Sequence, residues 1–132
     1  MPSIFTKIIN REIPGYIVAE TGEFIAFLDV FPLAEGHVLV VPKIETDYLF
    51  DLHDEGLAGI MIFAKKVARA IKKSIPCKRI GVAVIGLEVP HAHIHLIPLQ
   101  SVEDINFSRP KIKVAAERLQ QVADAIRINF GQ

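Results

Sequence analysis

The sequence predicts a single α+β domain that combines a group of strands with one long helix and a C-terminal helix. Three observations support this fold class. Short apolar segments of strand length recur along the chain, a longer central segment has apolar residues at helical spacing, and no segment rich in Pro, Gly or Ser divides the 132 residues. A chain of this length can bury one core, and a composition of 51% apolar and 23% charged residues is typical of a globular protein.

The N-terminal part is predicted to form a short helix and then a β-hairpin. Ser3 can cap a short apolar helix that ends before the turn signal at Pro14. Residues 16–20 and 24–28 have the character of strands, and the connection 21–23 contains a glycine and is short enough for a hairpin. An antiparallel meander therefore begins here.

Three further strands and two helices are predicted downstream. Residues 37–42 form an apolar strand that ends at a proline, which has no N–H to donate. Residues 54–74 form the main amphipathic helix, with lysines near its end. Residues 78–85 and 92–99 are the fourth and fifth strands, and residues 114–128 form the last helix. The apolar face of the main helix is expected to comprise Leu57, Ile60, Met61, Ala64, Val67, Ala68 and Ile71.

Charge and cysteine content exclude several classes of function. Fifteen basic residues balance fifteen acidic ones, so the chain lacks the net positive field that attracts nucleic acids. Cys77 is the only cysteine, which excludes an internal disulfide and favours a reducing compartment. The sequence has no secretion signal and no apolar stretch of about 18 residues. We therefore expect a cytoplasmic protein that binds neither nucleic acid nor membrane.

Three of the five histidines alternate with apolar residues over positions 91–95. At the period of a strand, His91, His93 and His95 would share one face, while the residues between them point into the core. Rings about 6.6 Å apart disfavour protonation of one another, so at least one ring is expected to be neutral. A neutral ring whose second nitrogen donates to a carbonyl can attack phosphorus covalently. His93 is best placed for this attack, and a second histidine can protonate the leaving group.

Other interpretations of the polar residues stay open. Neutral imidazoles two residues apart on a strand can bind zinc, and three rings can also play a purely structural role. His37 can reach the same cavity, and Asp29 can accept from ribose hydroxyls or only organise its turn. Phe5 and Ile8 can line a base pocket or belong to the core. His53 is expected to face solvent near the start of a helix.

Two separate motifs resemble the histidine-triad (HIT) family. The first is residues 27–43, FLDVFPLAEGHVLVVPK, and the second is residues 91–97, HAHIHLI. The second matches the family signature His-φ-His-φ-His-φ-φ, in which φ is apolar. Similarity runs from Ser3 to Pro98, about three-quarters of the chain.

The resemblance implies a HIT-like five-stranded antiparallel sheet that continues across a homodimer, paired by the long helix and a neighbouring strand. It implies a single domain over residues 1–132, with a HIT core at about 3–100 and a C-terminal helical extension at about 111–130. The expected partner is a purine nucleotide, and neither a cofactor nor a metal is expected.

The resemblance also implies a role for each site residue. By motif position, His93 is the nucleotidylated residue, His91 supports it, His95 and His37 lie on the phosphate side, and Asp29 accepts from the ribose. The base cleft is expected to comprise Phe5, Ile8, Ile13, Phe27, Val30 and Leu39, with backbone amides near Val89 holding the phosphate.

Three departures from the family pattern concern the site. The loop 85–90 reads IGLEVP, where many relatives have Gly-Gln and then Ser or Thr. Glu88 brings a negative charge close to the expected phosphate, so it points away or shifts the leaving-group preference toward a cationic amine. Residues 81–85 lack an asparagine that is often found there. Ser3 and Thr6 stand where zinc-binding relatives have cysteines, so we expect no structural zinc.

Together these features predict a hydrolase or transferase. Its substrates would be purine nucleoside phosphoramidates or related nucleotidyl adducts, which react through a nucleotidyl-His93 intermediate. The third histidine, His95, favours hydrolysis over the uridylyltransferase branch, which has glutamine there. The alternatives are a dinucleoside polyphosphate hydrolase and a nucleotide-binding interaction protein with little turnover.

Overall fold

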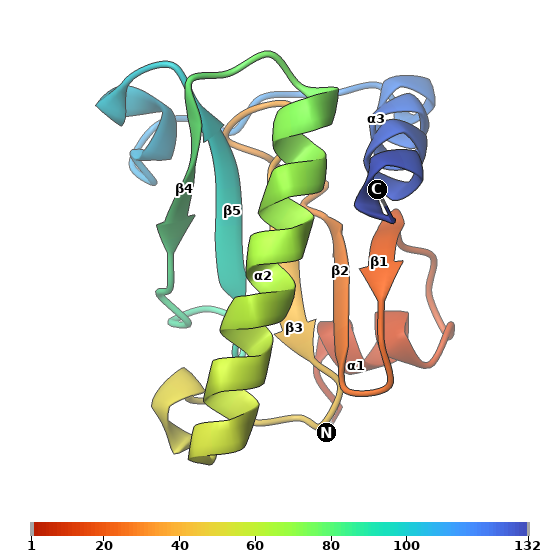
Figure 1. Cartoon of the computed structure of the whole chain (residues 1–132), viewed down its shortest axis with the longest axis vertical. Coiled ribbons are helices and arrows are strands. Elements are labelled where there is room, and N and C mark those ends of the chain that lie inside the picture. The colour runs from red at the N-terminus through yellow and green to blue at the C-terminus, as the bar shows by residue number, and fades with distance from the viewer. Residues whose placement is uncertain (1, 132) are drawn as a thin grey trace.

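The computed structural model describes residues 2–131 and is built around one five-stranded sheet (Figure 1). Neighbouring strands lie in the order β1-β2-β3-β5-β4, and every pair is antiparallel. The predicted α+β class and the five-stranded antiparallel sheet are confirmed. The strands are β1 Ile17–Glu20, β2 Phe24–Leu28, β3 Val38–Pro42, β4 Arg79–Ala83 and β5 Ile94–Leu99.

Capping side chains define the starts of two of the helices. The Ser3 hydroxyl accepts from the Thr6 N–H at 3.1 Å, and His53, which is exposed, accepts from the Gly56 N–H at 3.0 Å. None of the helices within residues 2–131 combines the length and apolar character needed to cross a bilayer. The helices are α1 Ile4–Ile9, α2 Asp54–Ser74 and α3 Ala116–Phe130, with short 3-10 helices η1 Leu49–Asp51 and η2 Val102–Ile105.

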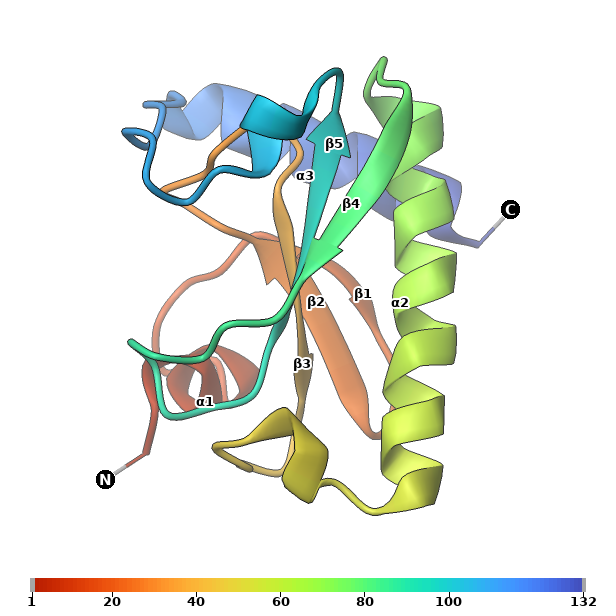
Figure 2. The same cartoon turned by 90° about the vertical axis from the view of Figure 1, so that its left-hand side faces the viewer.

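The sheet buries apolar side chains on both faces. Figure 2 shows α2 on one side of the sheet and α1 on the other. Val38 and Val40 of β3 pack in the larger core with α2 and α3, whereas Leu39 and Val41 pack in a smaller cluster with α1. This alternation follows from the two-residue period of a strand. The α1 side of the sheet is the side that carries the histidines.

The buried stripe of α2 differs from the predicted face at several positions, of which Phe63 and Met61 are the largest side chains. Phe63 is buried, whereas Met61 is 45% exposed. Ile60, Phe63 and Val67 recur at steps of three and four residues and therefore lie on one stripe. Met61 lies one residue outside this stripe and faces away from the core.

Several predicted element boundaries also shift, including the start of the last helix and the end of β4. The last helix begins at Ala116, because Ala115 has an extended backbone and is the N-cap. β4 ends at Ala83, before Gly86, which has a φ of 72°. The chain therefore leaves the sheet earlier than the apolar run suggested.

A glycine sets the direction of β3 at its start. Gly36 has a φ of 93°, and a Cβ at this position would lie 2.8 Å from a side-chain carbon of Ile75. Both the backbone conformation and the lack of space require glycine. The turn made by Gly36 brings His37 to the beginning of β3.

Candidate active site

The predicted histidines gather at the junction between β3 and β5. β5 was expected to begin at Ala92 but begins at Ile94, so His91 and His93 lie just before the strand. The reason is that the Ala92 N–H donates to the Thr46 carbonyl at 2.6 Å instead of joining the strand ladder. The ring centroids of His93 and His95 are 4.9 Å apart, closer than the about 6.6 Å of an ideal strand.

His93 has one ring nitrogen bound and the other available. Its Nδ1 lies 2.7 Å from the backbone carbonyl oxygen of His91. Because a carbonyl can only accept, Nδ1 carries the hydrogen, and the lone pair of the neutral ring lies on Nε2. The ring contacts Phe5 of α1 edge-on, with centroids 5.0 Å apart. The arrangement therefore orients a potential nucleophile between Phe5 and His95.

His91 is held on both sides of its ring. Its Nε2 donates to the Pro42 carbonyl at 2.8 Å, and its Nδ1 therefore accepts from the Ser3 hydroxyl at 2.7 Å. Glu45 completes this group, since it accepts from the Ser3 N–H at 2.6 Å and from the Thr6 hydroxyl at 2.7 Å. Burial lowers the pKa of His91, which keeps the ring neutral. This network fixes the backbone carbonyl to which His93 donates.

A chain of hydrogen bonds orients His37 and His95. The Leu33 N–H donates to Nδ1 of His37 at 3.1 Å, so the hydrogen of the neutral His37 ring is on Nε2. That Nε2 lies 2.9 Å from Nδ1 of His95. His95 therefore accepts at Nδ1, and its own hydrogen lies on Nε2. The β3–β5 pairing, in which Leu39 is opposite His95, brings the two histidines together.

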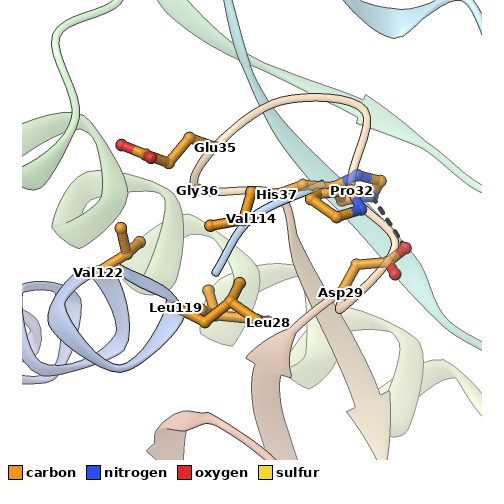
Figure 3. A pocket seen from close by; sticks show the side chains of 9 residues that line it. All are labelled: Leu28, Asp29, Pro32, Glu35, Gly36, His37, Val114, Leu119 and Val122. Carbon is orange, nitrogen blue, oxygen red and sulfur yellow. Dashed lines mark ion pairs between the residues drawn. The ribbon is translucent and has the colours of Figure 1, made fainter. Parts of the chain in front are cut away.

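Burial makes protonation of these two rings unfavourable. It lowers the pKa of His37 to about 3, with further contributions from the charges of His95 and Lys111, and the pKa of His95 to about 4. Figure 3 shows Asp29 beside His37, and an oxygen of Asp29 lies 3.7 Å from Nε2 of His37. With His37 neutral, this approach is not an ion pair at pH 7. Burial raises the pKa of Asp29, whose other oxygen accepts from the Phe31 N–H.

The loop that carries Asp29 and His37 is fixed by the C-terminal helix. Arg118 of α3 makes two hydrogen bonds to the Glu35 carboxylate, at 2.6 and 3.0 Å. Leu119 and Val122 of α3 line a small pocket together with this loop (Figure 3). The C-terminal helix thus supports the active-site loop from behind.

Most residues predicted for the base cleft lie together on the α1 side. They belong to the smaller apolar cluster beside α1. Val89 packs against this cluster, whereas Val30 lies outside it and is 45% exposed. Glu88 is also exposed. The rings of Phe5 and His93 are in contact, so the cluster borders the histidines directly. The predicted cleft residues that belong to the cluster are Phe5, Ile8, Ile13, Phe27 and Leu39.

One group of side chains has the chemistry and spacing to bind a metal. The candidate ligand atoms of Asp29, His37 and His95 lie within 4.8 Å of one another. The sequence suggested that the triad itself could bind zinc. In the structure, both ring nitrogens of His91 are hydrogen-bonded, to Ser3 and Pro42, so His91 has no nitrogen left for a metal. The absence of a metal from the working protein stays a prediction.

Two residues near the histidines were missed by the sequence analysis. The ring of Phe107 lies edge-on to His95, with centroids 4.8 Å apart, and 6.4 Å from that of His37. The ammonium of Lys111 lies 5.1 Å from the centroid of Phe107. Both residues belong to an irregular segment after β5 that has no periodic pattern, so only the three-dimensional contacts identify them.

The neutral histidines predict how stability changes with pH. The free energy of unfolding is expected to fall as the pH decreases from 7 to 5. His37 and His95 have folded pKa values of about 3 and about 4, below their ordinary 6.5. As the pH falls, these rings therefore bind protons in the unfolded chain before they do so in the folded one. The free energy of unfolding decreases below pH 6.5, by up to about 1.4 kcal/mol per pH unit for each ring.

Urea unfolding at several pH values measures this effect. His95→Gln is expected to reduce the dependence on pH between 7 and 5. An equal dependence in the wild type and in His95→Gln would contradict the assignment.

Comparison with known proteins identifies the family. The family model described as the HIT domain matches residues 10–102. Adenosine 5'-monophosphoramidase HNT1 of Saccharomyces cerevisiae is 43% identical, over 72% of this chain and 61% of the yeast protein. Adenosine 5'-monophosphoramidase hnt1 of Schizosaccharomyces pombe is 32% identical over 96% of both chains.

A solved structure shows the same architecture. The crystal structure of a Hit-like protein from Bartonella henselae superposes with a TM-score of 0.82 and is 33% identical, over 96% of this chain and 95% of that chain. The resemblance inferred from the two sequence motifs is therefore confirmed. This chain belongs to the HIT family.

Proposed function

We propose that this protein hydrolyses phosphoramidates of purine nucleoside monophosphates through a covalent intermediate on His93. The observation that carries the proposal is the 2.7 Å contact between Nδ1 of His93 and the His91 carbonyl. In the neutral ring, Nε2 of His93 then carries the lone pair, and the ring centroid of His95 lies 4.9 Å from that of His93. A nucleophile and a proton donor are thus adjacent, as a two-step displacement at phosphorus requires.

The reaction would proceed in two balanced steps. First, Nε2 of His93 bonds to phosphorus while the P–N bond to the amine breaks, and the amine takes a proton from His95. Second, a water oxygen bonds to phosphorus, the bond to His93 breaks, and a water proton returns to His95. The negative phosphate raises the pKa of His95, so His95 enters the first step as the cation and becomes neutral when the amine takes its Nε2 proton. Nδ1 of the cation donates, so Nε2 of His37 accepts in the complex and the hydrogen of His37 moves to its Nδ1.

The surroundings of His93 suit a purine nucleoside. The apolar cluster that includes Phe5, Phe27 and Leu39 offers aromatic and aliphatic surface for the base. Asp29 lies at the end of β2, where its carboxylate can accept from ribose hydroxyls. The two yeast relatives are named adenosine 5'-monophosphoramidases, which supports adenosine as the nucleoside and an amine as the leaving group.

Rapid acid quench with a labelled adenosine phosphoramidate tests this function. We expect release of AMP and a burst of label attached to protein during the first turnover. Nucleotide binding without turnover and without attached label would instead favour a nucleotide-binding interaction protein. Turnover of dinucleoside polyphosphates but not of the phosphoramidate would favour the polyphosphate hydrolase.

We also propose that the protein forms a homodimer through α2 and β4. β4 lies at the edge of the sheet, and Val82 on it is 52% exposed. Met61 and Ile62 of α2 are 45% and 58% exposed. An open edge strand beside exposed apolar side chains is suited to a symmetric interface. Light scattering at micromolar concentration is expected to give the mass of a dimer, and a monomer mass would contradict the proposal.

A further inference from the structure

The segment between β5 and α3 brings an aromatic ring and a positive charge to the part of the site that contains His95. Most of it, including Phe107 and Lys111, follows the region that the HIT family model matches, which ends at residue 102. Phe107 contacts the ring of His95, with centroids 4.8 Å apart, and the Lys111 ammonium lies 5.1 Å from the Phe107 centroid. Figure 2 shows this segment on the same side of the sheet as α1.

Hydrogen bonds hold this segment in place. The Ile112 N–H donates to the carbonyl of Pro32 at 2.9 Å, which ties the residue after Lys111 to the active-site loop. Asn106 accepts from the Ser108 N–H at 2.9 Å, and Arg109 donates to the Glu103 carbonyl at 2.8 Å. These bonds fix the turn that carries Phe107 and Lys111. They therefore hold Phe107 against His95 and Lys111 over Phe107.

The charge of Lys111 acts on the site. Burial is the largest cause of the pKa shift of each group, raising that of Asp29 and lowering those of His37 and His95, and the charge of Lys111 acts to lower all three. Asp29 is the acidic group that faces the same histidines, and one of its oxygens is bound by the Phe31 N–H. Glu88, which was expected either to point away from the phosphate or to favour a cationic amine, is exposed in the loop before the triad. Lys111 thus brings a positive charge close to His95, the proposed proton donor.

We propose that Phe107 and Lys111 form a leaving-group subsite that selects amines carrying a negative charge, such as the carboxylate of an amino acid joined through its nitrogen to phosphorus. Phe107 covers the ring of His95 and excludes water from the proton donor. Lys111 pairs with the carboxylate of the leaving amine. This assignment rests on the proposed phosphoramidate hydrolysis and specifies the substrate class.

A matched pair of substrates tests the subsite. The adenosine 5'-phosphoramidates of glycine and of glycinamide have nearly the same size and differ by one negative charge. We expect kcat/KM to be about fivefold to tenfold higher for the glycine adduct, the effect of one partly screened charge at this range. Lys111→Gln is expected to bring the ratio close to one. Lys113→Gln, in the same segment, is the matched control and is expected to keep the wild-type ratio.

The possible outcomes separate this assignment from the proposed function. Hydrolysis of both adducts with the same ratio in the wild type and in Lys111→Gln would overturn the subsite alone. A wild-type preference for the glycinamide adduct would also overturn it and would favour the influence of Glu88. If the wild type hydrolyses neither adduct, the proposed function fails and the subsite fails with it. If the wild-type ratio of kcat/KM for the glycine adduct to that for the glycinamide adduct also declines with added salt, the preference has an electrostatic origin.

Discussion

Replacement of His93 by alanine is expected to reduce phosphoramidate hydrolysis by at least about 10⁴-fold, because removal of a covalent nucleophile eliminates the two-step route. Nδ1 of His93 donates to the His91 carbonyl, whereas Nδ1 of His91 and of His95 accept hydrogen bonds. His91 has both ring nitrogens occupied, by Pro42 and Ser3. It therefore cannot replace His93 as the nucleophile. Steady-state AMP release and rapid acid quench measure the loss.

A matched histidine variant controls for general effects of the substitution. His53→Ala removes an exposed histidine that caps α2 and does not contact the triad, so its turnover is expected to equal that of the wild type. His93→Ala is expected to retain its circular dichroism spectrum and to bind AMP. Turnover by folded His93→Ala at the wild-type rate would exclude His93 as the nucleophile.

Local periodicity predicted the elements whose boundaries depend on neighbours along the chain. The helix α2 begins and ends at the predicted residues, because its apolar stripe, its cap and its terminal lysines are all encoded locally. The start of β5 depends instead on a bond from Ala92 to Thr46, which is distant in sequence. No pattern within the strand could show where that bond removes the chain from the sheet.

The same distinction applies to the site. The histidine motif is visible in the sequence because its members alternate within a few residues, and His37 belongs to the other motif, residues 27–43. Phe107 and Lys111 lie in an irregular segment whose approach to His95 depends on a long-range bond between Ile112 and Pro32. The tautomers of His37 and His95 likewise follow from the Leu33 N–H, which sequence could not reveal.

The second large effect concerns His95, whose ring contacts that of the proposed nucleophile His93 with centroids 4.9 Å apart. His95→Gln is expected to reduce hydrolysis of adenosine phosphoramidate by about 10²- to 10⁴-fold, because a glutamine amide cannot transfer a proton to the leaving amine. The p-nitrophenyl ester of AMP releases a phenolate that needs no proton. Its hydrolysis is therefore expected to fall by roughly tenfold or less in the same variant.

This comparison distinguishes proton transfer from a structural role. His95 is buried against Phe107 and His37, so a variant that merely disturbed the packing would slow both substrates equally. Phe107→Leu changes the same packing but leaves the proton donor in place, and it is expected to affect the two substrates to a similar extent. An equal loss for both substrates in His95→Gln would show that His95 positions its neighbours and that the proton comes from another group.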